Sequence, residues 1–210
     1  IISTYAGTPQ ARGYSGDGGL AVNALLSFPS DVFVRGTNLY IAEIGNSVIR
    51  KVDMLTGVIT TIAGTGTQGY SGDGGLAINA QFDRPRSVFV DVAGNIYIAD
   101  TFNFAIRKID TVTGIISSIA GTGVAGHALD GELAAGTTIE WIHDLAMSSD
   151  GTLYFSEQNG YNLLRKIVNG RIYTIAGQAG NNSLGDCGPS AYASLFKPYG
   201  IAFDSYDNIY

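Results

Sequence analysis

Internal repetition is the feature that most constrains how this chain folds. Residues 1–57 and 58–114 match over most of their length, and both contain the stretch GYSGDGGLA. Residues 115–170 form a more divergent third copy, and residues 171–210 begin a fourth that reaches DNIY. A period of about 57 residues indicates a repeat architecture in which each copy is one supersecondary unit packed on its neighbours.

Each copy contains four short segments rich in Ile, Val, Tyr and Phe. In the second copy they are centred near Val88, Tyr97, Ile106 and Ile116, and a Gly94-Asn95 turn separates the first two. Short β-branched runs between turn residues predict strands. Four strands per repeat are typical of β-propeller blades, whereas helical solenoids need a 3.6-residue period that is missing here. We therefore predict an all-β protein made of four-stranded antiparallel blades.

The stretch from Pro85 to Asp110 carries a longer motif, P-x-S-V-x-V-D-x-x-G-N-I-Y-I-A-D-x-x-N-x-x-I-R-K-I-D. This motif resembles the NHL repeat, and the resemblance implies a propeller of six blades. Six copies would need about 340 residues, and the chain has 210. We expect residues 1–210 to form a single partial propeller domain, about 3.5 of six blades, whose partners include the remainder of its own propeller.

Charge and composition exclude several classes of protein. The formal net charge is −6, and no dense cluster of Lys or Arg is present, so we expect no nucleic-acid binding. No apolar run approaches the length of a membrane span, which predicts no membrane insertion. A single cysteine, Cys187, excludes an internal disulfide scaffold. The sequon Asn181-Asn182-Ser183 favours an extracellular or cell-surface location.

The loops between copies contain glycine-rich stretches with one aspartate each. Gly64–Gly69 fits G-x-G-x-x-G, but no helix can start at its last glycine, which excludes a dinucleotide site. Asp17, Asp73, Asp130 and Asp186 could bind Ca²⁺, yet each glycine-rich stretch has a single aspartate, and a turn-fixing role is favoured. After this loop, GLAINAQF predicts one or two helical turns with Ala77 and its apolar neighbours toward the sheet.

An acid, an asparagine and an arginine recur at the end of the second strand and in the third strand. Acid and arginine on neighbouring antiparallel strands can pair, and a feature repeated in each copy is more easily explained by structure than by catalysis. We therefore interpret the following residues as structural repeat positions: Glu43, Asp100, Asn103, Arg107 and Glu157.

The residues that break the repeat are the candidate binding residues. The third copy loses the proline found at Pro85 and gains Trp141, His143 and Asp144 at the entry to its first strand. The equivalent channel-entry positions in the first two copies are Asp31 and Ser87. We expect these five residues to lie near the mouth of the central channel.

Two classes of function follow from this pattern. A rigid disc with variable loops favours a binding or scaffold module for protein or carbohydrate partners, with no cofactor and no catalytic residue. The alternative is an enzyme, because six-bladed relatives resembling amidating lyases or lactonases hold a metal in the channel. Asp31, His143 and Asp144 would then bind Ca or Zn in a metal-dependent lyase or lactonase-like hydrolase.

Overall fold

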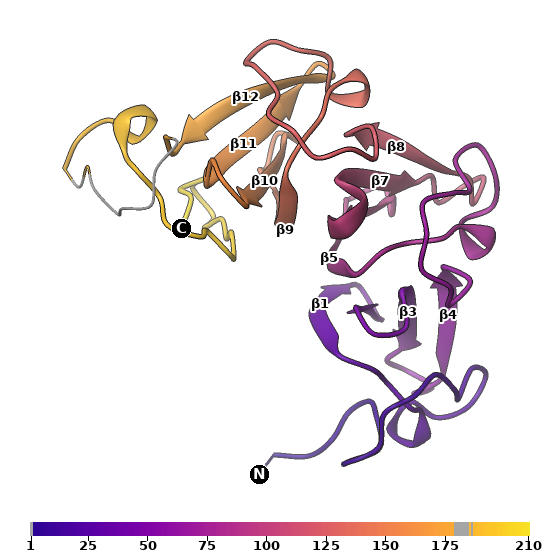
Figure 1. The fold of residues 1–210 in the computed structure, drawn as a ribbon. Helices are drawn as coiled ribbons and strands as arrows, with labels where there is room; N and C mark the ends of the chain where they lie inside the picture. The colour runs from indigo at the N-terminus through magenta and orange to yellow at the C-terminus, as the bar shows by residue number, and fades with distance from the viewer. Residues whose placement is uncertain (1, 179–184, 186) are drawn as a thin grey trace. The chain divides into compact units, whose positions relative to one another are not determined.

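The computed structural model describes residues 2–178, 185 and 187–210. The sequon at residues 181–183 and the loop aspartate Asp186 lie outside the described residues. Three four-stranded antiparallel sheets, each built from strands consecutive in sequence, make up the described part of the chain (Figure 1). None of these sheets closes on itself, as expected for an incomplete propeller. The predicted all-β class and the four-stranded blades are confirmed.

The first three copies each supply one sheet. The first sheet has the order β1-β2-β3-β4, with β1 Pro29–Arg35, β2 Asn38–Glu43, β3 Val48–Asp53 and β4 Ile59–Ala63. The second has the order β5-β6-β7-β8, with β5 Pro85–Val90, β6 Ile96–Asp100, β7 Ala105–Ile109 and β8 Ile116–Ala120. The third has the order β9-β10-β11-β12, with β9 Trp141–Met147, β10 Leu153–Gln158, β11 Leu163–Val168 and β12 Arg171–Ala176.

The chain divides into two compact units. One contains Ile1–Ile96 and Ile109–Ser117, and the other contains Tyr97–Lys108 and Ser118–Tyr210. The division passes through the second sheet. A single domain over residues 1–210 therefore stays a prediction.

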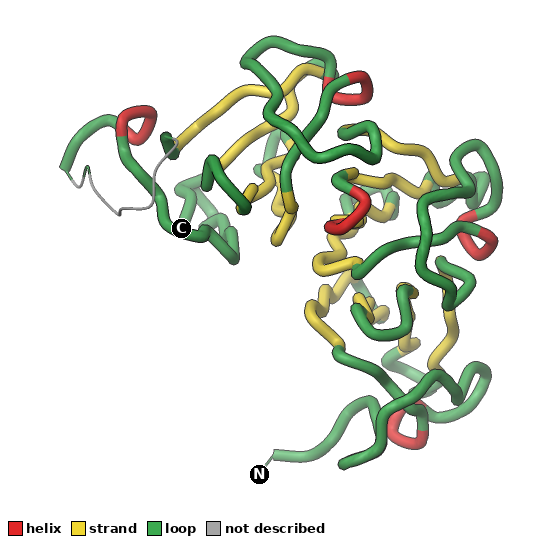
Figure 2. The backbone as a smooth tube through the Cα atoms, in the orientation of Figure 1, coloured by secondary structure: helices red, strands yellow, loops and turns green. Residues whose placement is uncertain are grey.

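Short 3-10 turns lie in the connections, and loops make up the rest (Figure 2). The turns are η1 Ala21–Asn23, η2 Ala77–Asn79, η3 Thr101–Asn103, η4 Ala134–Gly136 and η5 Ser190–Tyr192. The helical turn predicted in GLAINAQF is η2, and Ala77, Ala80 and Phe82 are buried as expected. Each helical turn in the described residues is three residues long, so none could cross a membrane.

Glycines after the fourth strands allow the chain to pass close to the next turn. Gly64 has φ +95°, and a Cβ added to it would lie 2.5 Å from the Ser47 carbonyl oxygen. Gly121 has φ +85° and approaches the Phe104 carbonyl in the same way. The first glycine of the G-x-G-x-x-G pattern is thus required by backbone conformation and close packing.

The fourth copy repeats the start of a blade. Asp204 accepts hydrogen bonds from the Asn208 backbone and side-chain amides, as Asp91 does from those of Asn95. Phe203 and Ile209 form an antiparallel bridge. These contacts reproduce the turn between the first and second strands of the second copy.

Candidate functional site

A buried ion pair joins the second and third strands of each sheet. The acid–arginine distances are 3.2 Å for Glu43–Arg50, 3.3 Å for Asp100–Arg107 and 3.2 Å for Glu157–Arg165. All three arginine side chains are completely buried. Because two buried charges must satisfy each other, these pairs constrain how the two strands meet.

Neighbouring amides complete the pairing of the acids. Asn46 donates to Glu43 Oε2 at 2.7 Å, and Asn103 donates to Asp100 Oδ2 at 2.9 Å. Burial raises the pKa of Glu43 and of Glu157, and the paired arginines oppose that rise. The acid–asparagine–arginine pattern that recurs in the sequence thus corresponds to one hydrogen-bonded group within a blade.

The loop aspartates extend this network, which corrects the turn-fixing role expected for them. Asp17 Oδ1 accepts from Arg50 at 2.6 Å, and Asp130 lies 3.7 Å from Arg165. Asp130 Oδ1 also accepts from the Thr174 backbone and hydroxyl, each at 2.8 Å. Asp17 therefore pairs with a strand of its own copy, and Asp130 contacts both a strand of its own copy and the first residues of the following copy.

Asp31 and Asp144, expected at the channel mouth, each bind two backbone N–H groups. Asp31 Oδ1 accepts from Val32 at 2.8 Å and its Oδ2 from Val88 at 2.9 Å. Asp144 Oδ1 accepts from Leu145 at 2.9 Å and its Oδ2 from Ile201 at 2.7 Å. Both second partners lie 57 residues further on. Asp31 therefore links β1 to β5, and Asp144 links β9 to the equivalent segment of the fourth copy.

The remaining predicted positions are largely enclosed. Ser87 is buried, and His143 is 9% exposed, with its ring edge-on to Tyr199 at a centroid distance of 4.6 Å. Asp31 belongs to one compact unit, whereas His143 and Asp144 belong to the other. The described residues contain no group of three or more His, Cys, Asp or Glu placed to hold a metal. Metal binding by Asp31, His143 and Asp144 therefore stays a prediction.

Trp141 lies at the start of the third sheet, where the backbone conformation differs from that at the equivalent position of the other copies. Phe28, Arg84 and Lys197 each precede a proline and have a left-handed backbone, with φ between 48° and 51°. Trp141 is followed by Ile142 and instead begins β9, where it pairs with Gln158. Loss of the proline thus lengthens the strand by one residue at this end.

Aromatic side chains gather around this end. The Trp141 ring stacks on Phe102 of η3, with centroids 5.0 Å apart. His127, which replaces the tyrosine of the first two copies, stacks on Tyr161 at 3.9 Å. Both pairs consist of half-buried residues, so part of each ring is accessible.

A buried acid lies beside Trp141 in the chain. Glu140 is 9% exposed, and its Oε2 accepts a hydrogen bond from Asn159 at 3.3 Å. Burial raises the pKa of Glu140. Asn159 has φ 78° and lies in the turn between β10 and β11. Glu157 and Arg165 are eight residues apart, whereas the equivalent acid and arginine of the other two copies are seven apart, so one residue is inserted here. Sequence analysis did not select Glu140 or Asn159, although the inserted residue was a signal for them.

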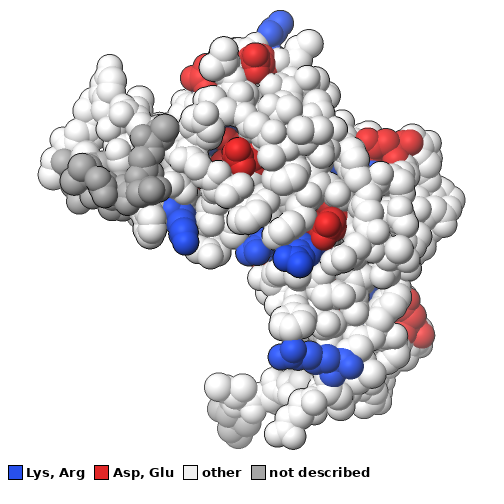
Figure 3. All heavy atoms as spheres, in the orientation of Figure 1, with Lys and Arg blue, Asp and Glu red and all other residues white. Residues whose placement is uncertain are grey.

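Charged side chains elsewhere are scattered. Figure 3 shows small separate groups of acidic and basic residues on the face that it presents, without a broad basic stripe among the described residues there. This distribution agrees with the net charge of −6.

Known proteins resemble the chain over part of their length. It is 30% identical over 167 residues to the protein Suppressor of quenching 1, chloroplastic, of Arabidopsis thaliana, covering 76% of this chain and 14% of that protein. It is 30% identical to Teneurin-1 of Gallus gallus, over all of this chain and 9% of the relative. NHL repeat-containing protein 2 of Gallus gallus is 36% identical over 52 residues, 25% of this chain and 7% of the relative. No family model matches the chain.

Solved structures support the propeller fold. An auxiliary nutrient binding protein from Bacteroides ovatus aligns with a TM-score of 0.59 and 18% identity, over 84% of this chain and 42% of the other. A virginiamycin B lyase from Staphylococcus aureus aligns with a TM-score of 0.53 and 15% identity, over 87% and 48%. A chain of a nidogen/laminin complex aligns with a TM-score of 0.53 and 11% identity, over 85% and 53%. At such identities the likeness defines the fold, which is that of β-propeller blades.

Proposed function

We propose that the chain is an NHL-type propeller segment that acts as a binding module, and that its ligand contacts the Trp141 end of the third repeat. This end comprises Phe102, Glu140, Trp141, Asn159 and Tyr161. Supporting the NHL assignment are the motif from Pro85 to Asp110 and the short relative of that name.

One observation carries the proposal: equivalent positions at this end vary while the blade interior repeats. The residue just before Pro29, Pro85, Ile142 and Pro198 is Phe28, Arg84, Trp141 and Lys197 in successive copies. By contrast, an acid and an arginine occupy the second and third strands of all three sheets. Variable side chains on a constant framework are how repeat scaffolds present a binding surface.

The chemistry of this end suits a protein or carbohydrate partner. Accessible aromatic ring faces pack against apolar side chains or the C–H faces of sugars, and amide and carboxyl groups supply directional hydrogen bonds. The net charge of −6 makes a nucleic-acid partner unfavourable. We place the protein outside the cell or at its surface, where such partners are common.

Trp141 is the only tryptophan, so its fluorescence reports directly on this end. Titration with panels of neutral oligosaccharides and of peptides should give a saturable emission change with at least one ligand. Phe102→Ala should lower the affinity for that ligand by about tenfold, because one well-packed aromatic contact is lost. Tyr206→Ala is the matched control, because Tyr206 is an 86% exposed aromatic in a turn of the fourth copy. Equal effects of the two variants would contradict the proposed location.

A further inference from the structure

The hairpin that joins β11 and β12 is shorter than its counterparts in the first two sheets. Asn169 and Gly170 alone separate the two strands, with φ of 51° and 72°. Two such residues form the tight turn that matches the twist of neighbouring strands. The first two copies have longer connections here, Asp53–Gly57 and Asp110–Gly114.

The shorter hairpin also lacks an acid that the other two contain. Asp53 Oδ1 accepts hydrogen bonds from the Leu55 and Thr56 backbone N–H groups, and Asp110 closes its own turn in the same way. Val168 takes the position of both aspartates. The lysine two residues earlier is kept in all three copies, so only the third copy has the cation without the acid.

Strand register brings a second cation to the same face. Lys166 pairs with Tyr173, and Val168 pairs with Arg171. Residues directly opposite each other, and residues two apart on one strand, share a face of the sheet. These four side chains and Asn169 line a hollow of about 430 Å³.

The first copy shows what the exchange does to the charge of this face. Its equivalent positions carry one cation and one anion, whereas the third copy has two cations and no anion. The first-copy residues are Lys51, Asp53, Val58 and Thr60. In that copy, which β5 follows in the chain, all four are still half-buried and not enclosed. Packing of a following repeat therefore leaves this part of the face accessible.

Neither cation of the third copy is neutralised by a nearby acid. Arg171 Nη1 donates to the Gly131 carbonyl at 2.5 Å, which holds the guanidinium and leaves further N–H donors on it. Among the described residues, no acidic side chain forms an ion pair with Lys166 or Arg171. Hydrogen bonds from Ser148 and Thr152 lower the pKa of Asp150, and the charge of Lys166 adds to this effect, so Asp150 is occupied by its own turn.

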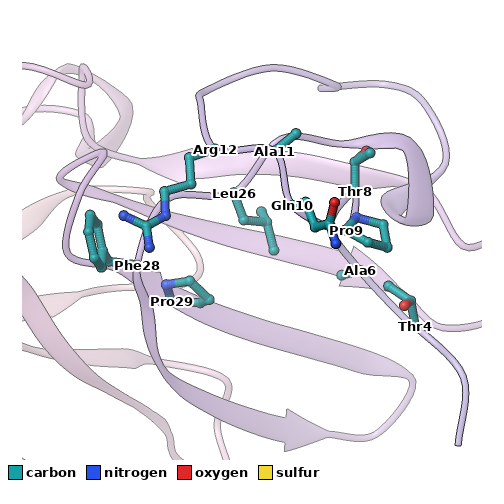
Figure 4. A pocket seen from close by; sticks show the side chains of 11 residues that line it. Thr4, Ala6, Thr8, Pro9, Gln10, Ala11, Arg12, Leu26, Phe28 and Pro29 are labelled. Atoms are coloured by element: carbon teal, nitrogen blue, oxygen red, sulfur yellow. The ribbon is translucent and has the colours of Figure 1, made fainter.

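A hollow of about 630 Å³ in the first copy offers a contrast (Figure 4). Arg12 is the charged side chain among the described residues that line it. Figure 4 shows Arg12 beside Phe28, and its guanidinium lies 4.1 Å from the ring centroid. One cation that is already stacked on a ring does not make the paired arrangement found in the hairpin.

We propose that the hairpin hollow binds a phosphate or sulfate ester, with Arg171 and Lys166 as its two cations. A guanidinium presents paired N–H donors to a tetrahedral oxyanion, and an ammonium adds a compact charge. The Tyr173 ring lines the same hollow and can pack against the group that carries the ester. The site is distinct from the Trp141 end, because Trp141 begins β9 and the hairpin lies at the other end of the same sheet.

An NMR titration of the isotopically labelled chain with sodium sulfate and with sodium phosphate tests the proposal. Ionic strength is held constant with sodium chloride, so that screening does not change during the titration. Saturable shifts are expected for the backbone N–H signals of Asn169, Gly170 and Arg171. A sulfated monosaccharide and its phosphorylated counterpart then show which ester binds more tightly. Acetate, which has a planar carboxylate, should bind more weakly than either.

Two substitutions at one position separate charge from shape. Val168→Asp restores the acid found in the other copies and should lower the affinity for both anions by at least about tenfold. Val168→Asn has nearly the same shape without the charge and should keep most of the affinity. Arg171→Gln should weaken binding by about tenfold. Lys108→Gln is the matched control, because this lysine of the second copy lies over the Tyr97 ring at 5.5 Å and has Asp110 two residues away.

The signals of the other two sheets confirm in the same spectra that each variant is folded. The proposal is overturned if neither anion gives saturable shifts at the hairpin, or if acetate binds as tightly as sulfate and phosphate. Equal affinities of Val168→Asp and Val168→Asn would also overturn it. So would a Lys108→Gln variant that loses as much affinity as Arg171→Gln, because binding would then follow total charge and not this site.

Discussion

Replacing Arg50 with methionine is the sharpest test of how a blade is held together. The guanidinium is fully buried and contacts Glu43 Oε1 at 3.2 Å, Asp17 Oδ1 at 2.6 Å and the Ser15 carbonyl at 3.2 Å. Arg50→Met keeps much of the aliphatic volume and removes the charge. The carboxylate of Glu43 then remains completely buried without its cation.

The size of the effect follows from the burial of each partner. Breaking a buried ion pair by removing one member costs about 3–5 kcal/mol. For a chain of this size, that loss corresponds to a fall in Tm of roughly 6–20 °C. Asp17 is different because its side chain is 46% exposed, so Asp17→Ala should cost only about 0–1 kcal/mol.

Urea unfolding followed by far-UV circular dichroism measures these differences. The double variant Glu43→Gln/Arg50→Met should recover at least about half of the loss, because no unpaired charge stays buried. Trp141 fluorescence reports on the other compact unit, so its transition shows whether the damage spreads. A cost below about 1 kcal/mol for Arg50→Met, or none recovered by the double variant, would refute the reasoning.

Three further predictions concern the hydrogen bond from Ile201 to Asp144, the buried acid Glu140, and the glycine Gly121. Asp144→Ala leaves the Ile201 N–H without its acceptor and should cost about 1–3 kcal/mol in urea unfolding. Glu140 has a raised pKa, so its protonated form stabilises the fold below its ordinary value of 4.5, and this stabilisation is lost as pH rises through the folded value. The stability of Glu140→Gln relative to wild type should therefore increase from pH 4 to pH 7 in parallel urea titrations. Gly121→Ala places a Cβ against a backbone carbonyl and should lower Tm far more than Gly131→Ala, whose φ is +88° but whose Cβ would meet nothing within 4 Å.

Sequence patterns were sufficient for the strands and for the pairing of acids with arginines. Four β-rich segments per copy predict the four-stranded sheets, and the constant spacing of Asp100 and Arg107 predicts contact between adjacent strands. Both inferences rest on local periodicity, which a single chain displays directly. The short helical turn that begins at the buried Ala77 followed from the same kind of local pattern.

Contacts with backbone atoms were harder to foresee. Asp31 binds the N–H of Val88, and a backbone N–H leaves no signature in the residue type that carries it. Asp17 reaches Arg50 across 33 residues, and its glycine neighbours suggested a local turn. The signal for the second contact was that the loop acids Asp17 and Asp130 recur in step with Arg50 and Arg165, since a repeated acid can meet a repeated arginine.

The distribution of these contacts explains how the loop ends can vary. The ion pairs and the close glycine contacts involve strands and their immediate connections, and they recur from copy to copy. The aspartate links occur in the first and third copies. The position of Arg84 is taken by Trp141 in the third copy, yet the buried acid–arginine distances of the two sheets stay at 3.3 Å and 3.2 Å. Selection for binding can therefore act on that position with little cost in folding free energy. A repeat whose strands are constrained in this way is expected to differ first at its loop end, which is where the third copy departs from the first two.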